Sequence, residues 1–147
     1  MAKAAIYYSK TGNTESIVKS MTDFSALKVL AENDDPNIMD PIIIESPKVE
    51  DYDWIVFASP VHGFQLAKVM KKYLESLVDL STKTIDIFVT HHFPFAWMGG
   101  KSTLKQMKKI IESKNGQVRY MTSINWTSKK RPTDIVKMLK IYTEQIF

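Results

Sequence analysis

Short apolar runs alternate along this chain with longer segments in which apolar residues recur at helical spacing. Five of the apolar runs predict β-strands, at residues 4–9, 26–30, 54–59, 85–90 and 117–125. Most are continuous rather than alternating between apolar and polar positions, which is typical of strands covered on both faces. A further run at 42–44 predicts either an extended loop or the true second strand.

Four amphipathic segments between and after these runs predict helices, at about residues 14–24, 66–77, 102–115 and 132–146. Ser102 is suited to cap the third helix, Gly116 follows its end, and Pro132 opens the fourth. The segment 31–48 contains three prolines, which interrupt any long helix, so we expect a short turn or irregular structure there.

The alternation of strands and helices with short connections predicts an α/β fold of three layers. Its strands are parallel, joined by right-handed crossovers, with helices on both faces. The chain has no repeat, low-complexity tract or linker, so we expect a single domain over residues 1–147. Ligands of such sheets bind beyond the carboxyl ends of the strands, so the informative loops are 9–14, 59–64 and 90–100.

Composition narrows the possible chemistry. The 147 residues are 44% apolar and include no cysteine, which excludes disulfide scaffolds, thiolate metal sites and cysteine nucleophiles. No run approaches 18 apolar residues, so we expect no membrane span. A Ser-Lys pair follows the first apolar residues too closely for a signal peptide, which predicts a soluble cytoplasmic protein.

Charge is distributed unevenly around a formal net charge of +4. Acidic residues concentrate between residues 32 and 53, whereas residues 101–147 carry 11 basic and 3 acidic side chains. The basic residues fall at the spacing of a helix surface and no nucleic-acid motif accompanies them. We therefore expect a solvated helix face and no nucleic-acid partner.

The loop after the first predicted strand has the composition of an anion site. It reads Ser9-Lys10-Thr11-Gly12-Asn13-Thr14, with three hydroxyl side chains and one glycine at the turn into a helix. A helix start offers unpaired N–H groups and the positive end of the helix dipole. Hydroxyl groups beside these N–H groups suit a terminal phosphate. The loop has neither the glycine pattern of a dinucleotide-binding motif nor the lysine of a Walker motif. An ordinary N-cap with turn chemistry is the alternative.

This stretch, from Tyr7 to Thr14, resembles the phosphate-binding signature Ser/Thr-x-Thr-Gly-x-Thr of the flavodoxin family. Motif, position and flanking elements agree, and the resemblance extends over essentially the whole chain, in the short form of the family. It implies a five-stranded parallel sheet in the order 2-1-3-4-5. It also implies that flavin mononucleotide (FMN) binds at the strand ends.

The second loop also resembles the family, in which a Ser-Pro-x-aromatic-Gly pattern follows the third strand. The resemblance assigns cofactor contacts to Ser59, Pro60, Val61, His62 and Gly63. The residue at His62 would lie against the isoalloxazine ring, and the Gly63 carbonyl would turn toward N5, a peptide flip that glycine permits. Histidine departs from the usual aromatic residue and would couple the flavin potential to pH. The alternative is a loop histidine without this role.

The third loop holds three aromatic residues, Phe93, Phe95 and Trp97, where the family contacts the other face of the ring. Stacking on the flavin is one interpretation; plugging the core or forming a partner patch is the other. Cofactor contacts are expected from Thr90, His91, His92, Phe93, Trp97 and Gly99. The pair His91-His92 has no third ligand nearby, so no metal site is expected.

The resemblance implies an electron carrier with non-covalent FMN, redox proteins as partners and a monomeric or weakly dimeric state. The acidic segment before the second loop would disfavour an anionic reduced flavin and steer a basic partner. An FMN-dependent NAD(P)H:quinone oxidoreductase is the first alternative, which the basic overall charge favours. A flavodoxin-fold module that acts by protein contact without flavin is the second.

Overall fold

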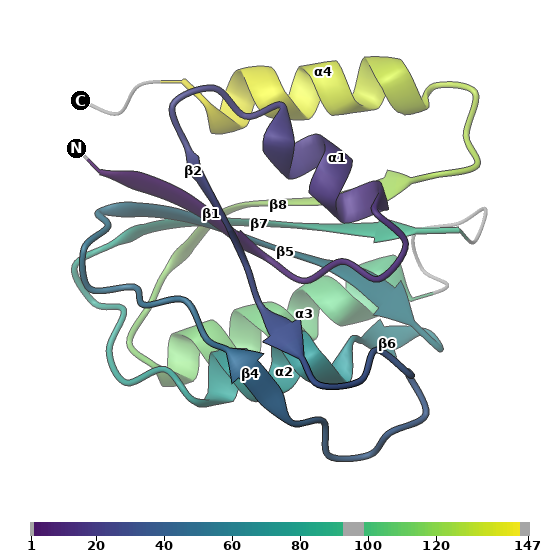
Figure 1. Cartoon of the computed structure of the whole chain (residues 1–147). Coiled ribbons are helices and arrows are strands. Elements are labelled where there is room, and N and C mark those ends of the chain that lie inside the picture. Colours follow the sequence, from purple (N-terminus) through teal and green to yellow (C-terminus); the bar gives the residue numbers. More distant parts are fainter. Residues whose placement is uncertain (1, 93–98, 145–147) are drawn as a thin grey trace.

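The computed structural model describes residues 2–92 and 99–144, and it has the expected three layers. Helices α1 (Asn13–Lys19) and α4 (Arg131–Tyr142) cover one face of a twisted sheet. Helices α2 (Lys68–Glu75) and α3 (Gly100–Ser113) cover the other face (Figure 1). Within the described ranges, no helix combines the length and apolar composition needed to cross a bilayer.

The main sheet has five parallel strands in the order β2-β1-β5-β7-β8. Their bounds are Ser25–Lys28 (β2), Lys3–Tyr7 (β1), Trp54–His62 (β5), Thr84–His91 (β7) and Val118–Asn125 (β8). This order confirms the predicted 2-1-3-4-5 topology. A short strand β6 (Gln65–Leu66) pairs antiparallel with the end of β5 and extends the sheet locally.

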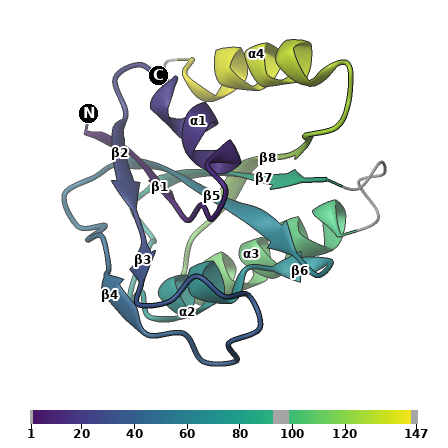
Figure 2. The ribbon, with the colours of Figure 1, turned by 45° about the vertical axis from the view of Figure 1, so that its right-hand side comes forward.

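The segment expected to be irregular contains a small second sheet. Strand β3 (Leu30–Ala31) pairs antiparallel with β4 (Ile43–Glu45), so the run 42–44 is not the second strand of the main sheet. Figure 2 shows these strands beside α2. The Tyr73 hydroxyl donates to the Pro47 carbonyl at 2.6 Å, which ties this segment to α2. The prolines exclude a helix here, as expected.

The helices have their predicted places but differ at their ends, with α2 spanning Lys68–Glu75 rather than 66–77 and α4 ending at Tyr142 rather than 146. Helix α1 ends at Lys19 rather than near Phe24, and Asp23 adopts a positive φ of 69°. Met21 and Phe24 are nevertheless buried, because the turn returns them to the same core. Helix α3 begins at Gly100, two residues before the expected cap, with left-handed Gly99 at its N-cap position.

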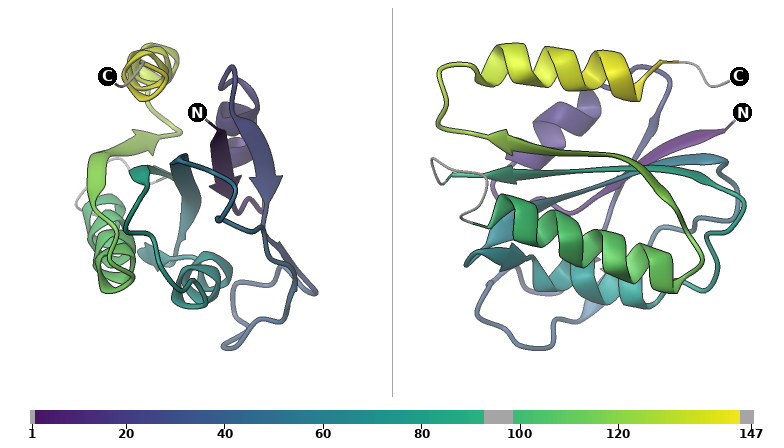
Figure 3. Two further views of the ribbon diagram at one scale, coloured as in Figure 1. Left: turned by 90° about the vertical axis from the view of Figure 1, so that its left-hand side faces the viewer. Right: turned by 180° about the vertical axis from the view of Figure 1, so that it is seen from behind.

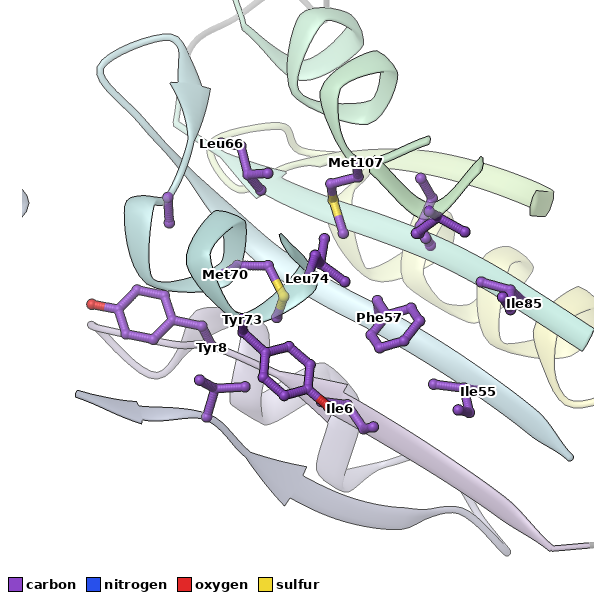
Figure 4. Close-up of a cluster of buried hydrophobic side chains, with 14 of the residues drawn as sticks. Ile6, Tyr8, Ile55, Phe57, Leu66, Met70, Tyr73, Leu74, Ile85 and Met107 are labelled. Carbon is purple, nitrogen blue, oxygen red and sulfur yellow. The ribbon is translucent and has the colours of Figure 1, made fainter. Parts of the chain in front are cut away.

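The sheet separates two apolar layers, and β5 contributes to both because successive side chains point to opposite faces. Ile55 and Phe57 face α2 and α3, whereas Val56 and Ala58 face α1 and α4. Figure 4 shows the first layer, in which Phe57 lies among side chains of α2 and the neighbouring strands. Its labelled members are Ile6, Tyr8, Ile55, Phe57, Leu66, Met70, Tyr73, Leu74, Ile85 and Met107.

An ion pair between buried Asp86 and partly exposed Arg119 stabilises the edge strand β8. The fully buried Asp86 carboxylate accepts hydrogen bonds from Arg119 Nη2 at 2.7 Å and Arg119 Nε at 3.0 Å. It also accepts from Trp54 Nε1 at 3.0 Å and from the Tyr120 backbone N–H at 3.1 Å. The β7–β8 register shifts at this point, so the carboxylate takes the place of a missing ladder acceptor.

Substituting Asp86 by Asn will therefore destabilise the fold. The substitution weakens two charge-assisted hydrogen bonds to the partly exposed Arg119 guanidinium, and we expect the free energy of unfolding to fall by about 2 kcal/mol. Urea denaturation followed by circular dichroism measures the change. The matched control is Asp51→Asn at an exposed site, which should change stability by less than about 0.5 kcal/mol. Equal effects of the two substitutions would contradict this account.

Candidate functional site

Three loops meet at one edge of the sheet because β1, β5 and β7 are parallel neighbours. Side chains join the first loop to the third. The Thr14 and Thr90 hydroxyl oxygens lie 3.0 Å apart in a buried hydrogen bond, and Asn13 Nδ2 lies 3.3 Å from His92 Nε2. The parallel pairing thus brings together residues more than 70 positions apart in the chain.

In the first loop, Ser9 shapes the backbone rather than pointing outward. Its buried hydroxyl oxygen accepts hydrogen bonds from the backbone N–H of Gly12 at 3.1 Å and of Glu15 at 3.4 Å. Gly12 precedes α1 with a left-handed φ of 94°, and a Cβ added there would meet nothing within 4 Å. The loop is therefore closed on its inner side and open above Gly12.

The open side of this loop presents hydrogen-bond donors. The geometry of a helix start leaves the N–H groups of Asn13 and Thr14 without partners inside the helix. Lys10 and Thr11 are exposed beside them. The N–H groups together with Lys10 and Thr11 can accommodate a small anion. Glu15, also in the first turn, accepts a hydrogen bond from the Tyr7 hydroxyl at 2.7 Å, and this hydrogen bond lowers the pKa of the Glu15 carboxyl.

The second loop is mostly strand, which corrects the expected loop at 59–64. Strand β5 continues through His62, where it pairs with Gln65 of β6. Only Gly63 and Phe64 form the turn, with φ values of 56° and 65°. Positive φ at both positions is the type I′ pattern of two-residue hairpins. Pro60, Val61 and His62 thus lie on a hairpin arm, while the fully buried Ser59 donates to the Pro60 carbonyl at 2.9 Å.

His62 is half-buried and connects the hairpin to the end of β1. Its ring lies edge-on to the Tyr8 ring, with centroids 5.9 Å apart. Burial lowers the pKa of His62, and the nearby positive charge of Lys10 lowers it further, with a partial offset from Asp34. The imidazole is therefore biased toward its neutral form.

Sequence reasoning missed Asp34 and Tyr8 as neighbours of this site. The Tyr8 hydroxyl donates to Asp34 Oδ1 at 3.3 Å, and Asp34 acts electrostatically on His62. A pocket of about 400 Å³ lies alongside, lined by Pro36, Asn37, His62, Gly63, Gln65, Leu66 and Lys68. The composition around Asp34 predicts a turn. No pattern in the nearby sequence indicates that this turn lies beside His62, 28 residues further along the chain.

The expected loop at 90–100 is shorter in the structure, because Thr90 and His91 are the last, buried residues of β7 and Gly100 opens α3. Thr90 contacts Thr14, and His91 is 2% exposed, with its ring near Gly100. His92 is exposed and contacts the first loop. Phe93, Phe95 and Trp97 lie outside the described residues.

Gly99 closes the third loop against the second. Its φ is 118°, and an added Cβ would lie 2.9 Å from Phe64 Cα and 3.0 Å from Val61 Cγ1. Glycine is therefore required by both backbone conformation and close packing.

The fold and its three clustered loops define the class of flavodoxin-like α/β proteins. The family model described as the flavodoxin domain matches residues 4–144. No curated protein matches the sequence. The chain belongs to the flavodoxin family, whose members bind flavin.

Solved structures from several bacteria share the fold. Oxidised flavodoxin 2 from Bacillus cereus has a TM-score of 0.69 and 16% identity, covering 99% of this chain and 100% of that one. The flavodoxin from Streptococcus pneumoniae TIGR4 has a TM-score of 0.68 and 13% identity, covering 98% and 97%. A Lactobacillus acidophilus flavoprotein in complex with FMN has a TM-score of 0.64 and 16% identity, covering 92% and 97%.

The two left-handed glycines should respond differently to alanine. At Gly12 the space is open, so Gly12→Ala should cost only the backbone strain of about 1–2 kcal/mol. At Gly99 the same strain adds to an overlap with the Phe64 backbone, worth about 1–3 kcal/mol more. Thermal and urea unfolding measure both variants. A Gly99→Ala variant no less stable than Gly12→Ala would contradict the close packing of the two loops.

His62 should titrate below its ordinary pKa of 6.5, and Lys10→Gln should raise that pKa by removing a nearby positive charge. Imidazole NMR signals followed against pH measure both values, with exposed Lys19→Gln as the control. Just below pH 6.5, His62 is protonated more fully in the unfolded chain than in the folded protein, so the free energy of unfolding should fall as the pH is lowered.

His62→Gln should remove the contribution of His62 to this pH dependence of the free energy of unfolding. An unchanged pH dependence would contradict the assignment.

Proposed function

We propose that this protein is an electron carrier that holds FMN non-covalently at the edge formed by its three loops. Bound FMN supplies the one- and two-electron chemistry, and the chain supplies binding, orientation and electrostatic tuning. The observation that carries the proposal is the first loop, where the helix start lies directly after left-handed Gly12 and the space at Gly12 is open. The similar L. acidophilus structure, described as a complex with FMN, gives further support.

The first loop fits the terminal phosphate of FMN. Exposed Thr11 and Lys10 supply a hydroxyl and a positive charge, and Asn13 and Thr14 supply backbone N–H groups. Ser9 contributes by holding the loop backbone in place through its two accepted hydrogen bonds. Thr14 has a second role, because its hydroxyl ties the loop to Thr90.

The ring of FMN is expected between the hairpin and the third loop. On the hairpin side, Pro60, Val61, His62 and Gly63 would contact it, and the turn leaves Gly63 exposed. On the other side, His92 is accessible, and Phe93 and Trp97 stay predictions. A half-buried histidine beside the ring would couple electron uptake to proton uptake, because a positive imidazole favours a reduced, negatively charged ring.

Protein partners follow from this role, and we propose a cytoplasmic carrier that acts as a monomer or weak dimer. The lack of cysteine fits a reducing compartment. A reductase would accept hydride directly from NAD(P)H. A carrier needs a separate reductase, so electron uptake from NAD(P)H alone distinguishes the two.

Fluorescence titration of the apoprotein with FMN and riboflavin tests the proposal. FMN should bind much more tightly than riboflavin, because only FMN places a phosphate in the first loop. Thr11→Val should weaken FMN binding by about tenfold, the value of one hydrogen bond to a charged group. Riboflavin binding should not change.

The matched control is Thr22→Val at an exposed site away from the three loops, which should leave both affinities unchanged. Equal affinity for the two flavins would overturn the phosphate assignment. No binding of either flavin would overturn the carrier and the reductase together, and would favour a module that acts by protein contact.

A further inference from the structure

Helix α3 carries an exposed stripe of positive charge. Lys101, Lys105 and Lys109 are spaced four residues apart, so they lie on one side of the helix. All three are exposed, and they line a hollow of about 500 Å³ together with Ser102 and Gln106. We call these three residues the lysine stripe.

Within residues 2–92 and 99–144, no ion pair neutralises the stripe. The ion pairs of the described residues join Lys19 to Glu15, Lys72 to Asp40 and Arg119 to Asp86, and none includes the stripe. The only acidic residue of α3, Glu112, is near the C-terminal end of the helix. On α2, packed against α3, exposed Lys71 and exposed Glu75 both line a pocket with Gln106, so α2 presents charge of both signs beside the stripe.

This arrangement costs helix stability. Like charges four residues apart repel each other, and a lysine in the first turn opposes the helix dipole. Lys101 occupies that first turn, which contains no acidic residue. An external acidic surface would relieve both unfavourable effects, so the stripe is suited to a partner that the chain does not contain.

The stripe begins beside the candidate flavin site. Gln106 Oε1 accepts a hydrogen bond from the Leu66 backbone N–H at 2.9 Å, which holds α3 against the hairpin of the second loop. Gly99, directly before α3, packs on Phe64 at the hairpin turn. Phe64 is 48% exposed and provides an apolar contact next to the charges. A partner bound to the stripe would therefore lie close to the edge where the ring of FMN is expected.

From charge and position together, we infer that the lysine stripe docks an acidic electron-transfer protein for exchange of electrons with the flavin. The electron exchange in this inference rests on the proposed function, because it needs bound FMN. The docking of an acidic protein on the stripe does not depend on FMN. Complementary charge would raise the rate of encounter and orient the partner over the hairpin. The acidic segment 32–53, in the region of β3 and β4 beside α2, would repel the same partner and so limit its orientations.

A protein surface suits the stripe better than other polyanions. An amphipathic helix that lies on a membrane inserts apolar side chains, and the exposed positions of α3 are lysine, serine and one glutamate. Single-stranded nucleic acids need a series of aromatic stacking platforms along the positive charge. Phe64 lies at the start of the stripe, and α3 itself contains no aromatic residue. These partners are outcomes that the experiment below distinguishes.

The test compares two triple charge reversals in the FMN-loaded protein. Lys101→Glu/Lys105→Glu/Lys109→Glu removes the stripe. The control, Lys48→Glu/Lys137→Glu/Lys140→Glu, makes the same change of net charge at exposed positions before β5 and on α4. Figure 3 shows α3 and α4 on opposite faces of the sheet, so the control leaves the stripe intact.

The probe is rubredoxin, a small acidic iron protein, in its ferric state. Stopped-flow absorbance follows its reduction by the dithionite-reduced flavoprotein, with one electron leaving the flavin for each ferric ion that becomes ferrous. At low ionic strength, the stripe reversal should lower the second-order rate constant about tenfold or more. The control should change it less than about threefold, and high salt should remove the difference.

Equal rate losses in the two variants would overturn the inference, because they would reflect net charge rather than a docking site. Unchanged rates in both would also overturn it. Stripe-dependent binding to phosphatidylserine vesicles or an RNA oligonucleotide that is tighter than binding to rubredoxin would assign the stripe to those partners instead.

A separate measurement distinguishes failure of the docking from failure of the proposed function. FMN affinity should be the same in the parent and both variants, because the stripe makes no contact with the first loop. If the parent binds no FMN, NMR titration with rubredoxin still tests docking through chemical shifts at Lys101, Lys105 and Lys109. No shifts at these residues would overturn the inference.

Discussion

The parallel pairing of β1, β5 and β7 is the constraint on which the rest of this structure depends. The ladders align Tyr7 with Ala58 and Pro60 with Thr90, so the three strands end at one edge. Each strand continues into a loop that can form no site by itself. Thr14 meets Thr90, and Gly99 meets Phe64, only because the ladders fix where the strands end.

The contacts that stabilise the sheet and the loops of the candidate site lie at opposite ends of the same strands. Trp54 opens β5 and donates to Asp86, which holds Arg119 of the edge strand. That end holds the buried Asp86 carboxylate, its partly exposed partner Arg119 and cation–aromatic contacts, with the Arg119 guanidinium 5.0 Å from the Trp54 ring. The other end carries left-handed glycines, a tight hairpin and exposed donors. The strain of these loops is tolerated because the core and the opposite end of the sheet stabilise the fold.

Acidic and basic side chains gather on different parts of the surface. The acidic segment surrounds β3 and β4, and the lysine stripe follows α3, which starts at the third loop. Docking through α3 would place an acidic partner at the end of the sheet that carries the three loops, while Asp86 and Arg119 stay remote from it. The alternation of helices and strands thus supplies both a rigid sheet and two differently charged flanks.

The order of strands and helices and the first loop could be predicted from the sequence, because each depends on residues close together in the chain. Continuous apolar runs identify the buried strands β1, β5 and β7, whereas the edge strands β2 and β8, predicted from runs of the same kind, are mostly exposed or half-buried. Gly12 among hydroxyl residues marks a turn into a helix. The extension of β5 through His62, the hairpin turn at Gly63 and Phe64, and the contact of Tyr8 with Asp34 could not be predicted. These features depend on pairing and packing between segments tens of residues apart, or on a positive φ at a phenylalanine that no local pattern favours. Local periodicity determined the elements, and long-range packing decided which residues share the site.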